Sequence, residues 1–326
     1  MHHRRFLLAA GCAGAAARWA GPARAQAWPS RPLRLVVPYP PGGAVDLAGR
    51  LIADALRERL GQPVVVENRG GAGGNIGVAA VAKSAPDGYT LAATAVNSLA
   101  INQFMYDRLP FDPERDLVPV SLGWEAPLVL VVPAGHVPAR TVKEFVAWAK
   151  GQPGGVTFGS SSIGTTVHLS GALFCRRTGI DGTHVPFRGG SEALTALLRG
   201  DTRFAVDNLP TVIAAVREGT LRALAVTSAE RWPDLPDVPT MVEAGVPDLV
   251  VTSWGAVSVP AGTPRPIVER LSGAIRAVAA DPATQARFAP TGNRPLGSTP
   301  EEAAARAARE RPMWREAVRI SGARLD

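Results

Sequence analysis

The chain has 326 residues, two cysteines and a formal net charge of +7 at neutral pH. Its length exceeds that of a usual single domain, so two domains are expected. Its basic residues are scattered singly, which argues against nucleic-acid binding, and beyond the N-terminus no apolar run approaches the roughly 20 residues of a membrane span.

Residues 1–25 have the pattern of an export signal. Basic side chains at 2–5 precede an apolar run at 6–17 and a small-residue cleavage site at 23–25. We expect cleavage near Ala25 and a soluble, exported product. The Sec and Tat routes both stay open, because two adjacent arginines are followed directly by phenylalanine. A lipoprotein box at Cys12 is the weaker alternative. Cleavage removes four arginines, lowering the charge by four, and leaves Cys175 without a disulfide partner.

The first part of the chain alternates strands and helices, which is typical of a parallel sheet. Three short buried strands are expected at residues 33–38, 64–67 and 90–95. The clearest helix carries an apolar stripe from Leu47 to Leu60, with Asp46 as its N-cap and Gly61 as its stop. A second helix is expected at residues 76–83.

A second set of alternating elements begins with an extended run at 128–132. Helices are expected at 141–150, 165–178, 191–198, 210–218, 266–279 and 300–320. Strands are expected at 156–159, 184–187, 204–206, 221–227 and 250–259. If the chain crosses near 126 and returns near 252, one lobe comprises residues 28–125 plus 252–326, and the other comprises 126–251. Two sequential domains with a single crossing are the alternative.

Two strands run into glycine-rich turns, at residues 38–46 and 67–77, and a helical pattern follows each turn. Such turns direct backbone N–H groups and a partial positive charge at a bound anion. Neither contains a Gly-Lys-Ser/Thr ending, and Ile76 stands where a dinucleotide-binding fingerprint starting at Gly71 needs its third glycine. Purely structural turns are the alternative.

Three serines, Ser160 to Ser162, lie between a strand and a helix, where a hydrolase would place its nucleophile. A Gly-x-Ser-x-Gly elbow fails, because Ser160 and Ile163 stand where glycine is required. Hydrogen bonding to a ligand or helix capping is the better interpretation, and an exported serine hydrolase is the rival function. His168 follows in the helix, while His136 and His184 lie elsewhere without matching partners, so no metal set is predicted.

Polar side chains at two later strand ends are further candidates, since ligands bind beyond the carboxyl ends of parallel strands. Asp207 and Asn208 follow a strand, and Asp207 either contacts a ligand or caps the next helix. Arg188 is the best candidate for a charge-assisted contact with a carboxylate, against the alternative of a solvated surface arginine.

The chain resembles the extracytoplasmic substrate-binding receptors of tripartite tricarboxylate transporters, the Bug family, from the signal to Asp326. The resemblance rests on short motifs along the whole chain, namely Pro40-Pro-Gly-Gly43 with Asp46, 61–69 (Gly-Gln-Pro-Val-Val-Val-Glu-Asn-Arg), 71–77 (Gly-Ala-Gly-Gly-Asn-Ile-Gly), 87–90 (Asp-Gly-Tyr-Thr), 184–186 (His-Val-Pro) with Gly189 and Gly190, 207–210 (Asp-Asn-Leu-Pro), 235–239 (Leu-Pro-Asp-Val-Pro) and 259–264 (Val-Pro-Ala-Gly-Thr-Pro).

The resemblance implies a type II periplasmic binding protein fold, in which two α/β lobes close on a small carboxylate. A di- or tricarboxylate, an acidic amino acid or an aromatic acid would then pass to membrane subunits of the transporter. No catalysis or cofactor is implied, and a monomer is expected. A binding protein that works as a sensor partner is a further alternative.

Carried over by motif, the ligand-binding residues would be Tyr39, Pro41, Gly42, Gly43, Asn97 and Ser98 from one lobe, and Ser160, Ser161, Gly164 and Asp207 from the other. Supporting residues would be Asp46, His168, Arg188 and Asn208. Two departures from the family pattern bear on the pocket: Ala172 replaces a usual glutamate, and Gln103 replaces a common proline.

Overall fold

A computed structural model describes residues 28–325, so the export signal predicted for residues 1–25 lies outside the described residues. The strands are β1 (Leu33–Val37), β2 (Val64–Asn68), β3 (Thr90–Ala95), β4 (Leu117–Pro133), β5 (Val156–Ser160), β6 (Gly182–Pro186), β7 (Ala205–Asn208), β8 (Leu221–Val226), β9 (Thr252–Pro260) and β10 (Arg294–Pro295). The helices are α1 (Ala44–Leu60), α2 (Asn75–Ala82), α3 (Val142–Lys150), α4 (Thr166–Thr178), α5 (Gly190–Arg199), α6 (Leu209–Arg217), α7 (Arg265–Ala280), α8 (Pro282–Phe288) and α9 (Pro300–Ser321).

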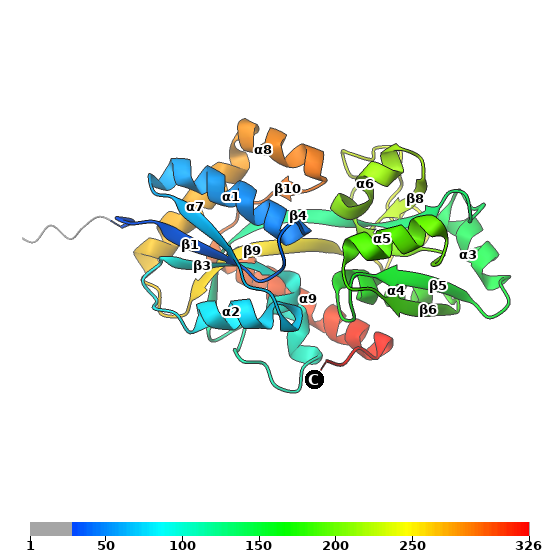
Figure 1. Cartoon of the computed structure of the whole chain (residues 1–326), viewed down its shortest axis with the longest axis horizontal. Coiled ribbons are helices and arrows are strands. Elements are labelled where there is room, and N and C mark those ends of the chain that lie inside the picture. Colours follow the sequence, from blue (N-terminus) through cyan, green and yellow to red (C-terminus); the bar gives the residue numbers. More distant parts are fainter. Residues whose placement is uncertain (1–27, 326) are drawn as a thin grey trace, which may run out of the picture.

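The first half of the molecule is built on a sheet with strand order β10-β4-β9-β3-β1-β2. Strand β1 pairs in parallel with both β2 and β3, as the alternating sequence pattern predicts. The strand that returns late in the chain, β9, lies between β3 and β4 and is antiparallel to both. Helices α1 and α7 pack together on this half (Figure 1).

Helix α1 contains the apolar stripe that the sequence predicts. Ile52, Leu56 and Leu60 are buried, and Gly61 ends the helix in the left-handed conformation with φ of 71°. The helix begins at Ala44, three residues earlier than predicted, and Gly43 is its N-cap. The prediction that Asp46 caps the helix is therefore wrong, because this residue lies inside the first turn.

The second half contains α3 to α6 with strands β5 to β8. The end of β4 pairs antiparallel with β7 and β8, while β5 and β6 form a parallel pair. A bridge between Phe158 and Phe204 connects β5 to the segment just before β7. The predicted second set of alternating elements is thus present, with boundaries shifted by at most two residues.

Strand β4 belongs to both halves. Its residues 117–127 pair with β9, and its residues 128–133 pair with β7 and β8. The sequence predicted only 128–132, because Pro119 and Pro127 argue against a strand. The register shifts near Pro119 and again before Trp124 show how the sheet accommodates this irregular stretch.

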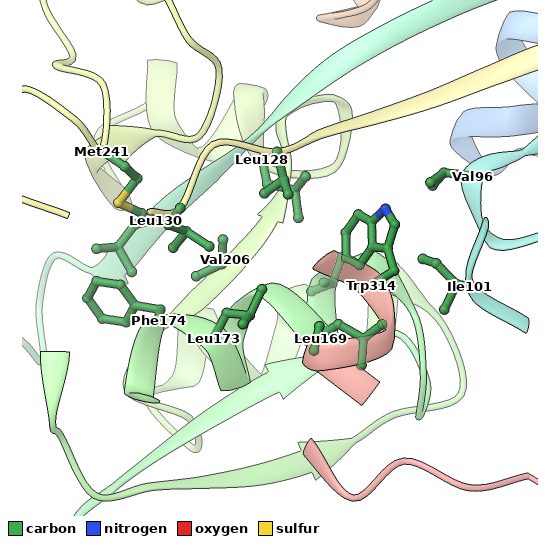
Figure 2. Packing of buried hydrophobic residues seen from close by; sticks show 14 of the residues in the cluster. Val96, Ile101, Leu128, Leu130, Leu169, Leu173, Phe174, Val206, Met241 and Trp314 are labelled. Carbon is green, nitrogen blue, oxygen red and sulfur yellow. The ribbon is translucent and has the colours of Figure 1, made fainter. Parts of the chain in front are cut away.

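The C-terminal helix α9 packs against α4 as well as against β4 and the segment that follows β3. Its Trp314 is fully buried. Figure 2 shows the Trp314 ring between Ile101 and Val96 of the first half and Leu169 of α4. The largest apolar cluster therefore connects the two halves, whereas two smaller clusters lie within one half each.

Candidate functional site

The loop after β1, residues 39–43, is held in shape by Asp46. One carboxylate oxygen of Asp46 accepts hydrogen bonds from the Gly42 N–H at 2.9 Å and from Arg50 at 3.0 Å. The other oxygen accepts from the Asn68 amide at 2.8 Å, and Asn68 also donates to the Tyr39 carbonyl. The β1 loop is thereby tied to the end of β2.

Burial raises the pKa of Asp46, but the hydrogen bonds from Arg50, Gly42 and Asn68 outweigh it and hold the pKa below its usual value. The charged carboxylate is thus the stable form. Its three partners leave it little capacity for a ligand, which agrees with the supporting role predicted for it.

The second glycine turn leaves room for two tyrosines. A Cβ on Gly74 would lie 3.3 Å from the Tyr39 hydroxyl, and a Cβ on Gly73 would lie 2.8 Å from the hydroxyl of Tyr106. Both glycines have positive φ. Burial raises the pKa of Tyr39 to about 12, so its hydroxyl stays a neutral donor. This turn therefore packs against residues 38–40 of the first one.

The segment after β3 begins with a π-helical turn, Asn97–Ile101, a feature frequent at functional sites. Ser98 is buried, and its hydroxyl has no hydrogen-bond partner within residues 28–325. Buried polar groups without partners are rare in folded proteins. The Ser98 side chain lies close to the Tyr39 phenol, whose pKa it lowers against the larger effect of burial.

The two halves meet through the serine loop, which we define as residues 160–164. The Asn97 amide donates to the Gly164 carbonyl at 3.0 Å. Gly164 has a φ of +74°, and a Cβ there would collide with the Met105 side chain, so a larger residue would strain the backbone and displace Met105. Predicted ligand residues of both lobes are thus in direct contact.

Two histidines support the serine loop from behind. The Gly164 N–H donates to His168 Nδ1 at 3.0 Å. The His168 ring stacks on His184, with centroids 3.7 Å apart, and His184 Nε2 lies 2.7 Å from the Ser160 hydroxyl. The expectation that His184 lies elsewhere without partners is wrong. Parallel pairing of β5 and β6 places Phe158 opposite His184, and Ser160 lies on the same face of β5 as Phe158.

Hydrogen bonding fixes the direction of the contact between Ser160 and His184. The Ser160 hydroxyl donates its single proton to the Ser162 carbonyl at 2.7 Å, so His184 must donate to Ser160. A general base would accept the serine proton instead. Ser160 is also fully buried, whereas Ser161 is half-buried and Ser162 is exposed. This geometry favours a structural Ser160 over a nucleophile.

Asp207 lies within β7 rather than after it, and it is buried. Its carboxylate accepts from the Asn208 N–H at 2.7 Å, and burial raises its pKa to about 7. Asn208 is the N-cap of α6, but its side chain makes no capping bond. The Asn208 side-chain oxygen is buried without a partner in the described chain.

The remaining predicted residues lie at the surface. Pro41, Gly42 and Gly43 are exposed. Arg188 is exposed too, and its backbone N–H donates to Glu192. Its side chain contacts none of the other predicted site residues in the described part of the protein. Within residues 28–325, no group of three or more acidic, histidine or cysteine side chains is arranged to hold a metal.

A sequence model of the family described as "Tripartite tricarboxylate transporter family receptor" matches residues 48–314. BugT of Bordetella pertussis is 39% identical over 326 residues and covers 100% of both chains. The chain belongs to this receptor family. The family predicted from the sequence motifs is thereby confirmed.

Two solved structures of receptor-family relatives resemble the present fold. R. palustris Rpa4515, solved with adipate, is 36% identical with a TM-score of 0.84, and the match covers 91% of this chain and 100% of that one. MatC of Rhodopseudomonas palustris, solved with bound malate, is 32% identical with a TM-score of 0.78, covering 89% and 99%. The predicted α/β binding-protein fold is confirmed.

Membership of the tripartite tricarboxylate transporter receptor family places the chain among periplasmic solute-binding proteins. In residues 28–325, no helix is long and apolar enough to cross a membrane.

Proposed function

We propose that this chain is a periplasmic receptor that binds a small dicarboxylate between its two halves and delivers it to the membrane subunits of a tripartite transporter. The hydrogen bond from Asn97 to the Gly164 carbonyl carries the proposal, because it joins the loops after β3 and β5 at the predicted site. Relatives with adipate and with malate support a carboxylate as the ligand.

We assign ligand contact to neutral donors around this junction. The buried Ser98 hydroxyl, the Tyr39 phenol and the Gly43 N–H come from the first half, and the Ser161 hydroxyl comes from the second. Backbone and hydroxyl donors bind a carboxylate without burying a full counter-charge. Burial raises the pKa of Asp207 to about 7, so its protonated form is available near neutral pH to donate to a carboxylate.

Closure of the halves follows from contacts that only the closed form makes. We assign residues 28–125 and 252–326 to one lobe and 126–251 to the other, with the hinge in β4 and β9. The ligand then shifts the population toward the closed form, which is the form presented to the membrane subunits.

The test is a thermal-shift and calorimetric screen of the exported protein, purified from the periplasm, against adipate, malate and their uncharged diamides. We expect both acids to raise the melting temperature and the diamides to leave it unchanged, because ligands that bind only the native state stabilise it. Stabilisation by amides or sugars and by no acid would refute the proposal.

A serine hydrolase remains the rival function, and a single assay separates the two. The receptor proposal expects ester hydrolysis no faster than buffer, and equal in the wild type and in the Ser161→Ala and Ser160→Ala variants. Turnover that disappears in one of these variants would favour the hydrolase.

A further inference from the structure

A cavity of about 560 Å³ lies behind the serine loop, between α4, β6 and the end of α9. This volume lies within the range that small-molecule sites occupy. None of Tyr39, Ser98, Ser161 or Asp207 lines it. We call it the α4–α9 cavity, and it is separate from the proposed ligand site.

The walls of the α4–α9 cavity combine an apolar surface with two imidazole rings. Phe158, Ala172 and Ile320 supply apolar surface, and the stacked rings of His168 and His184 supply polar edges. An apolar wall with a few convergent polar groups is the usual composition of a small-molecule site.

Each ring has one nitrogen left for an occupant. His168 Nδ1 accepts from Gly164, so Nε2 carries the proton of the neutral ring and is a free donor within the described chain. His184 donates through Nε2 to Ser160, so its Nδ1 is a free acceptor. His168 is only 4% exposed overall, and its ring lines the α4–α9 cavity.

The charges at the rim favour an anion. Arg176 lines the cavity, and it forms no ion pair within residues 28–325. The ammonium nitrogen of Lys150 lies 3.7 Å from where a Cβ on Gly179, another lining residue, would stand. Lys150 also has no ion-pair partner in the described chain. Two unpaired cations therefore flank the opening.

Two carboxylates nearby are directed elsewhere. Asp181 lines the cavity, but one of its carboxylate oxygens lies 3.0 Å from where a Cβ on Gly155 would stand, so the group is turned toward that glycine. Glu316 of α9 pairs with Arg319 at 2.9 Å. Beyond the pairing with Arg319, Arg176 also lowers the pKa of Glu316, and besides burial Asp181 raises the pKa of the Cys175 thiol, so these two carboxylates moderate the positive charge at the mouth of the α4–α9 cavity.

We propose that the α4–α9 cavity is a second binding site, which takes an amphipathic organic acid with an aromatic body and one carboxylate. The body packs on Phe158, Ala172 and Ile320, and the carboxylate faces Arg176. Such an occupant would contact the two histidines that hold the serine loop, on the side opposite the proposed dicarboxylate site.

The experiment uses 2-naphthoate as the probe and alkylation of Cys175 as the readout, because Cys175 lines the cavity. Burial raises the pKa of the Cys175 thiol to about 12, so the exported protein is treated with iodoacetamide at alkaline pH over hours, and modification of Cys175 is followed by peptide mass spectrometry. We expect 2-naphthoate at ten times its dissociation constant to slow alkylation roughly tenfold. The neutral analogue 2-naphthalenemethanol should protect at least tenfold less well at the same concentration.

Adjacent arginines on α4 provide a matched pair of variants. Arg176 lines the α4–α9 cavity, whereas Arg177 lies near Asp248 on the other side of the helix. Arg176→Ala should weaken protection by 2-naphthoate about tenfold or more, and Arg177→Ala should leave it unchanged. Ala172→Trp, which fills the cavity, should abolish protection while adipate still raises the melting temperature.

Equal protection in the wild type and in both Arg176→Ala and Ala172→Trp would overturn the proposal, since the probe would then act from another site. An absence of protection in the wild type would overturn it as well. Neither result depends on adipate binding, so failure here is distinct from failure of the proposed transport function.

Discussion

The Asn97 side-chain amide and the Gly164 main-chain oxygen lie 3.0 Å apart, and this hydrogen bond connects the loop after β3 to the loop after β5. Gly164 also donates its N–H to His168. The same peptide region is therefore fixed from the first half by an amide and from within the second half by an imidazole.

Asn97→Ala should weaken dicarboxylate binding about fivefold, because the closed form loses one hydrogen bond worth about 1 kcal/mol. Gln152→Ala is the matched control, since Gln152 also donates an amide N–H to a carbonyl, that of Trp148, at 3.1 Å and away from the site. Isothermal titration with adipate measures both. Equal affinities in the two variants would contradict the assignment of Asn97.

Gly164→Ala should lower the free energy of unfolding more than Gly245→Ala does. Both glycines have positive φ, so both variants carry the left-handed backbone cost of about 1–2 kcal/mol. A Cβ on Gly164 also collides with Met105, whereas a Cβ on Gly245 meets no atom within 4 Å. The free energies of unfolding of the two variants, measured in urea, should differ by about 1–3 kcal/mol, which is the usual cost of overpacking. A difference near zero would mean that Met105 moves aside freely.

The stacked histidines should make the fold less stable in acid. Burial lowers the pKa of His168 to about 4, helped by the neighbouring His184, and burial also lowers the pKa of His184 to about 4. Because the ordinary value is 6.5, the unfolded chain binds more protons between pH 4 and 6.5. Stability present above pH 6.5 is therefore lost as pH falls toward 4. The free energy of unfolding, measured in urea, should rise less steeply with pH across this range in His184→Gln than in the wild type.

Asp207 should have the opposite effect on the pH dependence of stability. Burial raises its pKa from 3.8 to about 7, so between these values the folded protein holds a proton that the unfolded chain has released. Its contribution to stability is present below pH 3.8 and is lost as pH rises through 7. Asp207→Asn should thus steepen the increase of stability with pH between 4 and 7. An unchanged slope would place the Asp207 pKa near its ordinary value.

Glu125→Gln should destabilise the fold by about 3–5 kcal/mol, the usual cost of breaking a buried ion pair. Glu125 is 5% exposed and bonds to Arg294 and, at 3.0 Å, to Arg306. Burial raises its pKa, but the two arginines outweigh burial and leave the pKa low. In Glu67→Gln, the exposed pair with Arg34 is lost instead, at a cost of about 1 kcal/mol or less. Unfolding in guanidinium chloride measures the free energy of unfolding of both variants.

The elements most visible in the sequence are those with regular patterns. Helix α1 shows an apolar stripe and a glycine stop, and β1, β2 and β3 are short apolar runs. The alternation of these strands with helices predicts their parallel pairing. The start of β4 is not visible in this way, because its two prolines and its register shifts are tolerated only through pairing with β9, which is more than 100 residues away in the chain.

The candidate site also combines features that can be predicted from the sequence with features that cannot. The loop positions of Tyr39, Asn97 and Ser160 follow from strand ends and family motifs. The partnership of Ser160 with His184 does not, because it depends on the parallel register of β5 and β6 and on the stacking of two rings. Periodicity in one segment carries no information about such a register.

Strand β4 passes from one half to the other without a loop, and Pro127 and Leu128 mark the change of pairing partners from β9 to β7 and β8. The return through β9 also begins at Thr252, directly opposite Pro127. The proposed rotation of the halves is therefore expected to twist and bend these two neighbouring extended chains, which should restrict its range.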